Sequence, residues 1–155
     1  MKKLYLLMSF LLLSSSLTAQ QGNDSPVIES RSRMSFNETI ETIKASAEGK
    51  GWKVLIVHDL QASLLKNGQE VLPVSVIEIC KPLYSGNILK QDIYRALSVL
   101  MPCRVSVYEK TGGEVYISRM NVGSLKNSSF GEDAAALMME AADEVEVILS
   151  ELKSE

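Results

Sequence analysis

The stretch from Val74 to Tyr108 constrains the fold of this 155-residue chain more than any other part of the sequence. It opens with an alternating, β-branched run that ends at Ile79-Cys80-Lys81-Pro82, and it closes with a second alternating run that begins at Met101-Pro102-Cys103. Proline cannot donate a hydrogen bond to a sheet ladder, so each run stops or starts beside its proline. The sequence therefore predicts two strands with a separate connecting segment between the two prolines.

This connecting segment is expected to be a broken helix. Proline suits the first position of a helix, which favours a helix that begins at Pro82. Gly86-Asn87 interrupts the helical pattern, so we predict one piece near Pro82–Lys90 and another near Ile93–Leu100. A connection of this length joins strands of either relative direction, and the sequence therefore leaves the directions of the two strands open.

The other elements follow from hydrophobic periodicity and turn signals. Ser35 followed by Glu38 has the spacing of a capping box and predicts an amphipathic helix at Phe36–Glu48. Two alternating runs around Thr111-Gly112-Gly113 predict a β-hairpin. A helix of about 18 residues is expected near the C-terminus. The five expected strands are Val27–Ser35, Trp52–Val57, Val74–Cys80, Cys103–Glu109 and Val115–Met120.

This order of elements predicts an α+β domain built as a two-layer sandwich. We expect a mixed sheet of about five strands with the helices packed on one face. The first strand is expected at an edge of the sheet, because its alternation is weak. The run Trp52–Val57 is expected at the centre, because it is short, apolar and rich in β-branched residues.

The first 20 residues have the three regions of a secretory signal peptide. Lys2 and Lys3 precede an apolar run from Leu4 to Leu13, and the segment Ser14-Ser15-Ser16-Leu17-Thr18-Ala19, made mostly of small residues, follows. The apolar run is too short to span a bilayer, which takes about 20 residues. We therefore expect an exported protein, soluble in the periplasm or secreted, with no membrane span after cleavage. Its parts are a signal peptide at 1–20, a flexible leader at 21–26 and a single domain at 27–155.

The charge balance argues against one class of partner. The formal net charge is −3 at pH 7, from 16 basic and 19 acidic residues that are scattered along the chain. Nucleic-acid binding depends on basic patches, so a mildly acidic domain of this kind is not expected to bind nucleic acid.

Several short motifs resemble those of a known family. They lie between about Met34 and Leu152, and they are Val57-His58-Asp59, Ile77-Glu78-Ile79-Cys80-Lys81-Pro82, Leu100-Met101-Pro102-Cys103 and Val105-Ser106-Val107-Tyr108-Glu109. In these motifs the chain resembles the domain of unknown function family 302. The resemblance implies a small α/β sandwich that is often dimeric, and it implies no reaction. Lys81 stands where the family pattern has asparagine, which removes a good helix cap from this corner.

The two cysteines, Cys80 and Cys103, admit three interpretations. A disulfide between them would contribute roughly 3 kcal/mol in the chain-entropy model, and it requires antiparallel strands that bring the two strand ends together. A reactive Cys80 thiolate is favoured by a helix start at Pro82 and by the positive charge of Lys81. A buried structural thiol is the third interpretation, and it is favoured because the chain has no Cys-x-x-Cys motif.

His58 is the only histidine in the chain, and it is therefore the one candidate imidazole base for a cysteine nucleophile. A soft Cu(I) site would combine Cys80, Cys103 and His58 with one of Met34, Met101 or Met120. No two of these residues share a short ligand spacing. We therefore assign no metal ligand, no cofactor and no catalytic residue from the sequence.

A ligand pocket is expected between the sheet and the broken helix, lined by Glu78, Tyr84 and Tyr94. The chain has no Gly-rich phosphate loop, Ser-His-Asp arrangement or paired catalytic carboxylates, which disfavours an enzyme. We predict a binding module for a small molecule or an envelope protein, assembled as a homodimer. The alternative is a thiol-dependent redox or soft-metal-handling protein. The candidate binding residues are Cys80, Glu78, Tyr84, His58 and Cys103.

Overall fold

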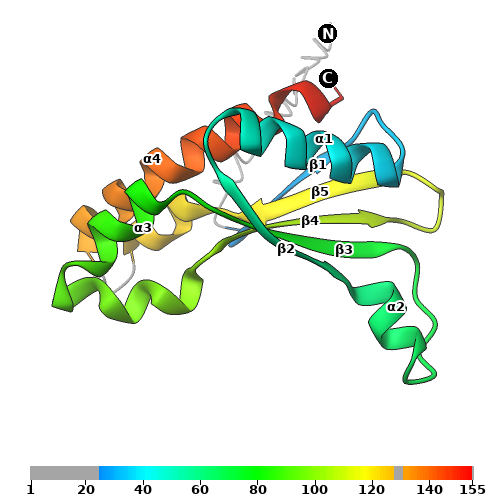
Figure 1. Cartoon of the computed structure of the whole chain (residues 1–155), viewed down its shortest axis with the longest axis horizontal. Helices are drawn as coiled ribbons and strands as arrows, with labels where there is room; N and C mark the ends of the chain where they lie inside the picture. Colours follow the sequence, from blue (N-terminus) through cyan, green and yellow to red (C-terminus); the bar gives the residue numbers. More distant parts are fainter. Residues whose placement is uncertain (1–24, 128–130, 155) are drawn as a thin grey trace, which may run out of the picture.

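A five-stranded sheet forms the centre of the computed structural model, which describes residues 25–127 and 131–154 (Figure 1). The order of strands across the sheet is β1-β5-β4-β3-β2. The predicted signal peptide and most of the predicted leader lie outside the described residues. The strands are β1 (Val27–Arg31), β2 (Lys53–Asp59), β3 (Val74–Cys80), β4 (Cys103–Glu109) and β5 (Val115–Met120).

Two long helices cover one face of this sheet, α1 (Phe36–Gly49) and α4 (Gly131–Leu149) (Figure 1). This arrangement confirms the predicted α+β two-layer sandwich. Five shorter helices lie at the ends of the layers: α2 (Leu60–Leu65), α3 (Pro82–Leu89) and the 3-10 helices η1 (Asp92–Leu100), η2 (Val122–Asn127) and η3 (Ser150–Leu152). No helix within the described ranges has the length and apolar character needed to cross a membrane.

The sheet is antiparallel throughout, and the prediction of a mixed sheet was wrong in this respect. The cause is the path of the connection between β3 and β4. Its two pieces, α3 and η1, match the predicted broken helix, but they lie beyond the end of the sheet and do not cross its face (Figure 1). The chain therefore returns beside β3 in the opposite direction.

The two edges of the sheet are β1 and β2. The edge position of β1 confirms the prediction, whereas the central position expected for β2 was wrong. Leu55 and Ile56 of β2 are 55% and 46% exposed. The β-branched residues of β2 therefore favour the extended backbone of a strand, which here pairs with one neighbour only. They do not indicate that both faces of the strand are buried.

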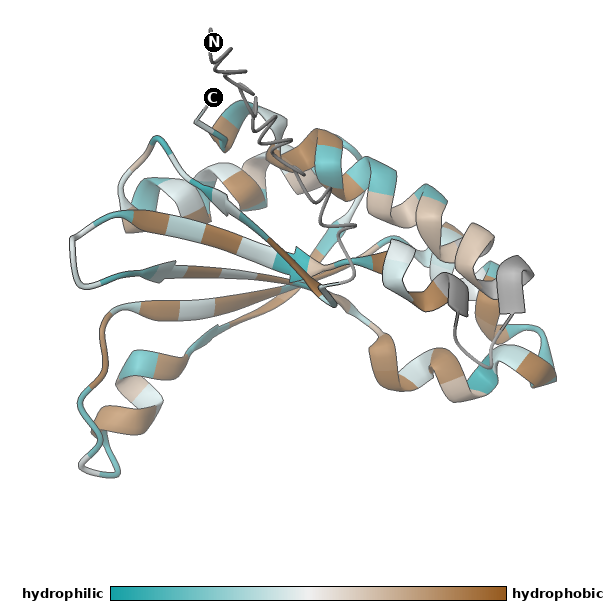
Figure 2. Cartoon of the chain, turned by 180° about the vertical axis from the view of Figure 1, so that it is seen from behind, coloured by the Kyte–Doolittle hydropathy of each residue, from teal (hydrophilic) through white to brown (hydrophobic). Residues whose placement is uncertain are grey.

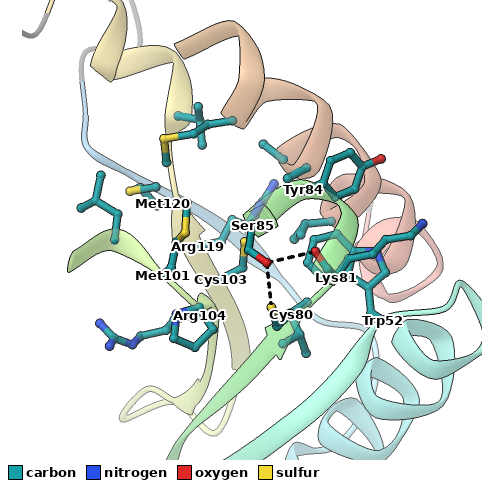
Figure 3. Close-up of a pocket in the computed structure, with 18 of the residues that line it drawn as sticks. Trp52, Cys80, Lys81, Tyr84, Ser85, Met101, Cys103, Arg104, Arg119 and Met120 are labelled. Atoms are coloured by element: carbon teal, nitrogen blue, oxygen red, sulfur yellow. Dashed lines mark hydrogen bonds between the residues drawn. The ribbon is translucent and has the colours of Figure 1, made fainter. Parts of the chain in front are cut away.

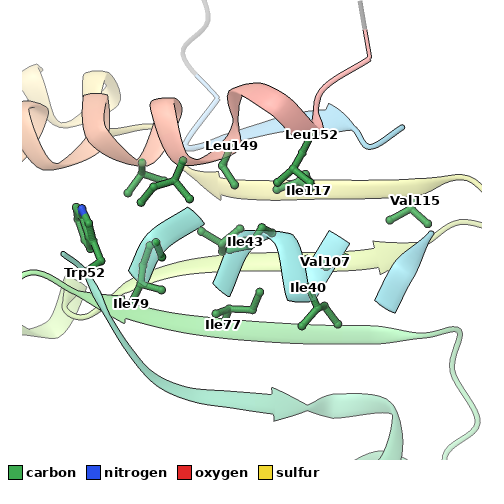
Figure 4. Packing of buried hydrophobic residues seen from close by; sticks show 14 of the residues in the cluster. Ile40, Ile43, Trp52, Ile77, Ile79, Val107, Val115, Ile117, Leu149 and Leu152 are labelled. Carbon is green, nitrogen blue, oxygen red and sulfur yellow. The ribbon is translucent and has the colours of Figure 1, made fainter. Parts of the chain in front are cut away.

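The main core lies between the sheet and the two long helices (Figure 4). Ile77 of β3 and Ile117 of β5 are fully buried beneath Ile43 of α1 and Ile148 of α4. The capping box predicted for α1 is present, with the Ser35 backbone N–H donating to Glu38 Oε2 at 3.1 Å. Alternation along the strands and a capped amphipathic helix thus place apolar side chains on facing surfaces of the two layers.

A second, smaller apolar cluster lies beyond the end of the sheet. It consists of Ile88 of α3, Leu97 of η1, Val122 of η2 and Met138 of α4. The helical segments between β3 and β4 therefore pack against the chain that follows β5, and this packing encloses a space at the ends of β3 and β4.

Candidate functional site

A cavity of about 230 Å³ lies where β3 ends and β4 begins, and we call it the end cavity (Figure 3). Its walls come from both apolar clusters, for example from Ile79 and Val145 of the main core and from Ile88 and Val122 of the smaller cluster. Most of its lining is apolar. The other side chains that face it are Cys80, Lys81, Tyr84, Ser85, Cys103, Arg104, Arg119 and Glu146.

The two proline corners position the thiols of the end cavity. Cys80 is the last residue of β3, and Pro82 starts α3 two residues later. Cys103 is the first residue of β4, directly after Pro102, whose peptide bond to Met101 is cis. The sequence motifs that bound the two strands therefore bring both cysteines to one end of the sheet.

Both cysteines are free thiols. The residue opposite Cys103 in the ladder is Ile79 and not Cys80. Because adjacent residues of a strand point to opposite faces, this register does not present the two sulfur atoms to each other as a disulfide needs. The Cys80 Sγ atom instead lies 3.6 Å from Ser85 Oγ (Figure 3). Burial raises the pKa of the Cys103 thiol from 9.0 to about 11, which opposes a nucleophilic role at neutral pH.

Glu144 of α4 joins three side chains at the rim of the end cavity. Its carboxylate accepts hydrogen bonds from Trp52 Nε1 at 2.7 Å, Tyr84 OH at 2.7 Å and Lys81 Nζ at 2.8 Å. The hydrogen bond from Lys81 is the main reason that the pKa of Glu144 is lowered. The bond to Glu144 also raises the pKa of Tyr84 to about 12. The Lys81 side chain does not cap α3. It forms an ion pair with Glu144 instead, and this pair links the corner between β3 and α3 to α4.

Arg119 and Glu146 form an ion pair beside the end cavity. Arg119 lies on the helix-facing side of β5 and is only 8% exposed. Its Nε and Nη2 atoms donate to the two carboxylate oxygens of Glu146 at 2.6 and 2.7 Å, and Nη1 donates to Ser30 Oγ at 2.8 Å. Lys153 donates a further hydrogen bond to Glu146. Burial opposes ionisation of Glu146, but the bonds from Arg119 and Lys153 outweigh it and lower the pKa of this carboxyl.

The structure separates the predicted site residues into two places. Cys80, Cys103 and Tyr84 line the end cavity. Glu78 and His58 do not line it, because they lie on the face of the sheet that α1 and α4 leave uncovered. There Glu78 Oε1 accepts from Arg104 Nε at 3.2 Å and lies 3.3 Å from His58 Nε2. Tyr94 packs against the smaller apolar cluster and is not part of the cavity lining.

Sequence reasoning missed Trp52, Glu144, Arg119 and Glu146 as parts of this region. For Arg119 a signal was available, because it takes the inward position after Val115 and Ile117 in the alternation of β5. A charged residue at an inward position needs a partner of opposite charge. No local signal marks Glu144, whose three partners lie between 60 and 92 residues away.

The end cavity offers an apolar surface with two thiols and three thioethers, from Met101, Met120 and Met138. This lining suits a small apolar molecule or a soft ion. Over residues 25–127 and 131–154 no three His, Cys, Asp or Glu side chains are grouped as a metal site requires.

Comparisons with known proteins agree with this fold. The solved structure of an uncharacterised conserved DUF302 protein from Bacillus stearothermophilus matches with a TM-score of 0.75, covering 83% of this chain and 98% of that chain. The two sequences are 19% identical, so this likeness concerns the fold alone. No curated protein matches this chain. The family model for the domain of unknown function DUF302 matches residues 28–152. The chain therefore belongs to the DUF302 family, which confirms the resemblance seen in its motifs.

Proposed function

We propose that this protein is a non-enzymatic binding module that holds a small apolar molecule in the end cavity. The observation that carries the proposal is the cavity itself, with a volume of about 230 Å³ and a mostly apolar lining. An apolar cavity of about 150 Å³ is enough to bind benzene in an engineered protein. The end cavity therefore has room for one aromatic ring with a short substituent, or for a branched aliphatic molecule of that size.

The surroundings of the cavity support binding without chemistry. The bonds of Glu144 to Trp52, Lys81 and Tyr84 join α4 to the residue before β2, to the corner between β3 and α3, and to α3 itself, and they hold these walls in place. A preformed cavity loses little conformational entropy when a ligand enters. His58 lies opposite Val76 in the β2–β3 ladder, four residues along β3 from Cys80, and its imidazole lies beside Glu78 and does not line the cavity.

Toluene is a suitable probe, and methionine methyl groups are suitable reporters. Met101, Met120 and Met138 line the end cavity, whereas Met34 packs against the main core with its sulfur 3.6 Å from Thr42 Oγ1. In protein with 13C-labelled methionine methyls, toluene is expected to shift the first three signals in a saturable way and to leave the Met34 signal in place. Equal movement of all four signals, or no movement, would contradict the proposal.

A pair of alanine variants on α4 provides the control. Ala142 lines the end cavity, and Ala136 is exposed on the same helix. Ala142→Leu is expected to fill part of the cavity and to weaken toluene binding at least about tenfold, since lost space removes ligand contacts outright. Ala136→Leu is expected to bind toluene like the wild type. If Ala142→Leu also binds like the wild type, the ligand site lies elsewhere.

We also propose that the protein forms a homodimer through α2 and the adjacent edge strand β2. The helix α2 contains three leucines but buries none of its residues within the chain. Leu60, Leu64 and Leu65 are 37%, 39% and 58% exposed, and Ile56 of β2 is 46% exposed. Figure 2 shows these apolar segments of α2 projecting from the sheet, away from α1 and α4. Contiguous exposed apolar residues of this kind suit a protein interface.

Sedimentation equilibrium tests the homodimer. The wild type is expected to sediment as a dimer, and Leu64→Glu as a monomer, because the charge would be buried at the interface. Leu83→Glu is the matched control, since Leu83 is 61% exposed on α3, at the opposite end of the sheet from α2. A monomeric wild type would contradict the proposal, and so would equal dissociation of both variants. In the latter case, a different surface forms the dimer.

We further propose that the protein is exported and acts in the periplasm or outside the cell, where an envelope protein is a second candidate partner for the α2 surface. The support is the order of a basic start, an apolar run and a small-residue end in residues 1–20. The intact mass of protein recovered from the periplasmic fraction tests this. Loss of the first 19 or 20 residues is the expected result, and an uncleaved cytoplasmic chain would contradict it.

A further inference from the structure

The charged side chains that line the end cavity are already paired. Four charged residues belong to its lining: Lys81, Arg104, Arg119 and Glu146. Lys81 Nζ lies 2.8 Å from Glu144 Oε2, and Arg104 Nε lies 3.2 Å from Glu78 Oε1. Arg119 and Glu146 pair with each other. A buried ionic ligand needs a counter-charge, and the lining residues that the structure describes offer none unpaired. The cavity therefore suits a neutral ligand.

One polar group of the lining, the hydroxyl of Ser85 on α3, is only weakly bonded within the chain. Ser85 Oγ lies 3.5 Å from the carbonyl oxygen of Lys81 and 3.6 Å from Cys80 Sγ (Figure 3). The first contact is longer than a normal O–H···O bond, and the second involves a thiol, which is a weak partner. A hydroxyl has two acceptor positions, and the Cys80 thiol fills no more than one of them. Ser85 Oγ is therefore available to accept a hydrogen bond from a ligand.

The remaining lining favours an aromatic ring over an aliphatic group. Trp52 and Tyr84 contribute two rings whose centroids are 5.9 Å apart, and three thioethers come from Met101, Met120 and Met138. Contacts between aromatic rings, and between sulfur and a ring, are both more favourable than the area they bury. Each such contact uses a different part of the ligand surface, so the side chains do not have to meet at one point.

We propose that the molecule held in the end cavity is a small phenol, whose hydroxyl donates a hydrogen bond to Ser85 Oγ and whose ring lies against the aromatic and thioether side chains. This assignment rests on the proposed function and names the chemical class of the ligand. A phenolic hydroxyl has a pKa of about 10, so at pH 7 such a molecule is neutral, as the paired charges of the lining require. Binding forms no covalent bond and transfers no electron.

Phenol and toluene test the hydrogen bond, because they have nearly the same shape and differ in one hydroxyl. The shifts of the methionine methyl signals at pH 7 give a dissociation constant for each. The wild type is expected to bind phenol at least as tightly as toluene. A cavity without a hydrogen-bond partner would bind phenol more weakly, since a buried hydroxyl that lacks a partner costs free energy.

Two serine variants locate the bond. Ser85→Ala is expected to weaken phenol binding about fivefold, the typical net contribution of one neutral hydrogen bond, and to leave toluene binding within about twofold of the wild type. Alanine is a good helix former, so α3 is expected to survive, with circular dichroism as the check. Ser98→Ala is the control, because Ser98 is exposed on η1 and does not line the cavity. It is expected to bind both probes like the wild type.

Cyclohexanol tests the preference for a ring, since it has a hydroxyl and a similar size but is not aromatic. It is expected to bind at least about threefold more weakly than phenol. Cyclohexanol that binds as tightly as phenol would overturn the aromatic part of the assignment. Equal phenol affinities of Ser85→Ala and Ser98→Ala, with toluene still bound, would overturn the phenol and leave the proposed function intact. If neither toluene nor phenol binds, both proposals fail.

Discussion

Replacing Glu146 by glutamine tests an ion pair whose arginine is buried between the sheet and α4. The partner of Glu146, Arg119, is 8% exposed and sits beneath α4 on the helix-facing side of the sheet. Two hydrogen bonds of 2.6 and 2.7 Å join the two side chains. The change Glu146→Gln keeps the size of the side chain and one acceptor oxygen, but it leaves the guanidinium charge of Arg119 without its counter-charge.

The expected loss of stability in Glu146→Gln depends on how deeply Arg119 and Glu146 are each buried. Removing one partner of a fully buried pair costs about 3–5 kcal/mol. The Glu146 side chain is 37% exposed, so solvent already screens part of the attraction. Glutamine also retains one hydrogen bond from the guanidinium. We therefore expect Glu146→Gln to lower the free energy of unfolding by about 2 kcal/mol, a value between those for exposed and buried pairs.

Urea denaturation followed by fluorescence measures this change, because Trp52 is the only tryptophan and is 3% exposed. Asp143→Asn is the control on the same helix, since Asp143 is exposed, and it is expected to change the free energy of unfolding by less than about 0.5 kcal/mol. The double variant Arg119→Met with Glu146→Leu is expected to recover most of the loss, because it removes both charges together. An equal, small effect of Glu146→Gln and Asp143→Asn would refute the inference that this pair is desolvated.

Three other predictions concern the stability of the fold. The pKa of Glu144 is lowered in the folded protein, so its contribution to stability is complete above the ordinary glutamate pKa and is lost as the pH falls through the folded value. In urea titrations from neutral pH to about pH 3, the free energy of unfolding is therefore expected to fall less steeply for Glu144→Gln than for the wild type. Ile77→Ala removes a side chain with no exposed surface and is expected to cost about 2–5 kcal/mol by urea denaturation, whereas Leu55→Ala, at a 55% exposed position, is expected to cost less than about 1 kcal/mol. Gly113 has a φ of +83°, which disfavours a side chain, so Gly113→Ala is expected to be destabilised by about 1 kcal/mol in thermal unfolding. Gly86 lies inside α3 with open space at its Cβ position, so Gly86→Ala is expected to be stabilised by up to about 1 kcal/mol in the same assay.

Strand positions were predictable from the sequence because alternation is a local property of the chain. The bounds of β3, β4 and β5 agree with the predicted ranges, and the fully buried Ile77 and Val107 lie at alternating positions of β3 and β4. Strand order and direction depend on where a connection packs, which no local pattern encodes. The sequence left the relative direction of β3 and β4 open, and the mixed sheet expected from the order of elements was wrong because α3 lies beyond the sheet end in the folded protein.

The sequence predicted the part of the candidate site that lies at the two proline corners. Cys80 and Cys103 attracted attention because each lies beside a proline at a strand end, and the structure places both on one cavity. The partners of this region come from α4, which docks on the sheet only in the folded chain. Glu144 was indistinguishable in the sequence from the solvated acidic residues around it, such as Asp143, although it accepts hydrogen bonds from Lys81, Tyr84 and Trp52.

The end cavity follows from the way the chain returns between β3 and β4. A crossover helix between parallel strands would have covered the face of the sheet and added to the main core. Because α3 and η1 lie beyond the strand ends, they bury their own apolar residues in a second cluster, and a space remains between this cluster and the main core. The residues at the strand ends must line that space, and in this chain they carry the sulfur atoms of Cys80, Met101 and Cys103. The antiparallel return that invalidated the mixed sheet is thus the same feature that creates the candidate site.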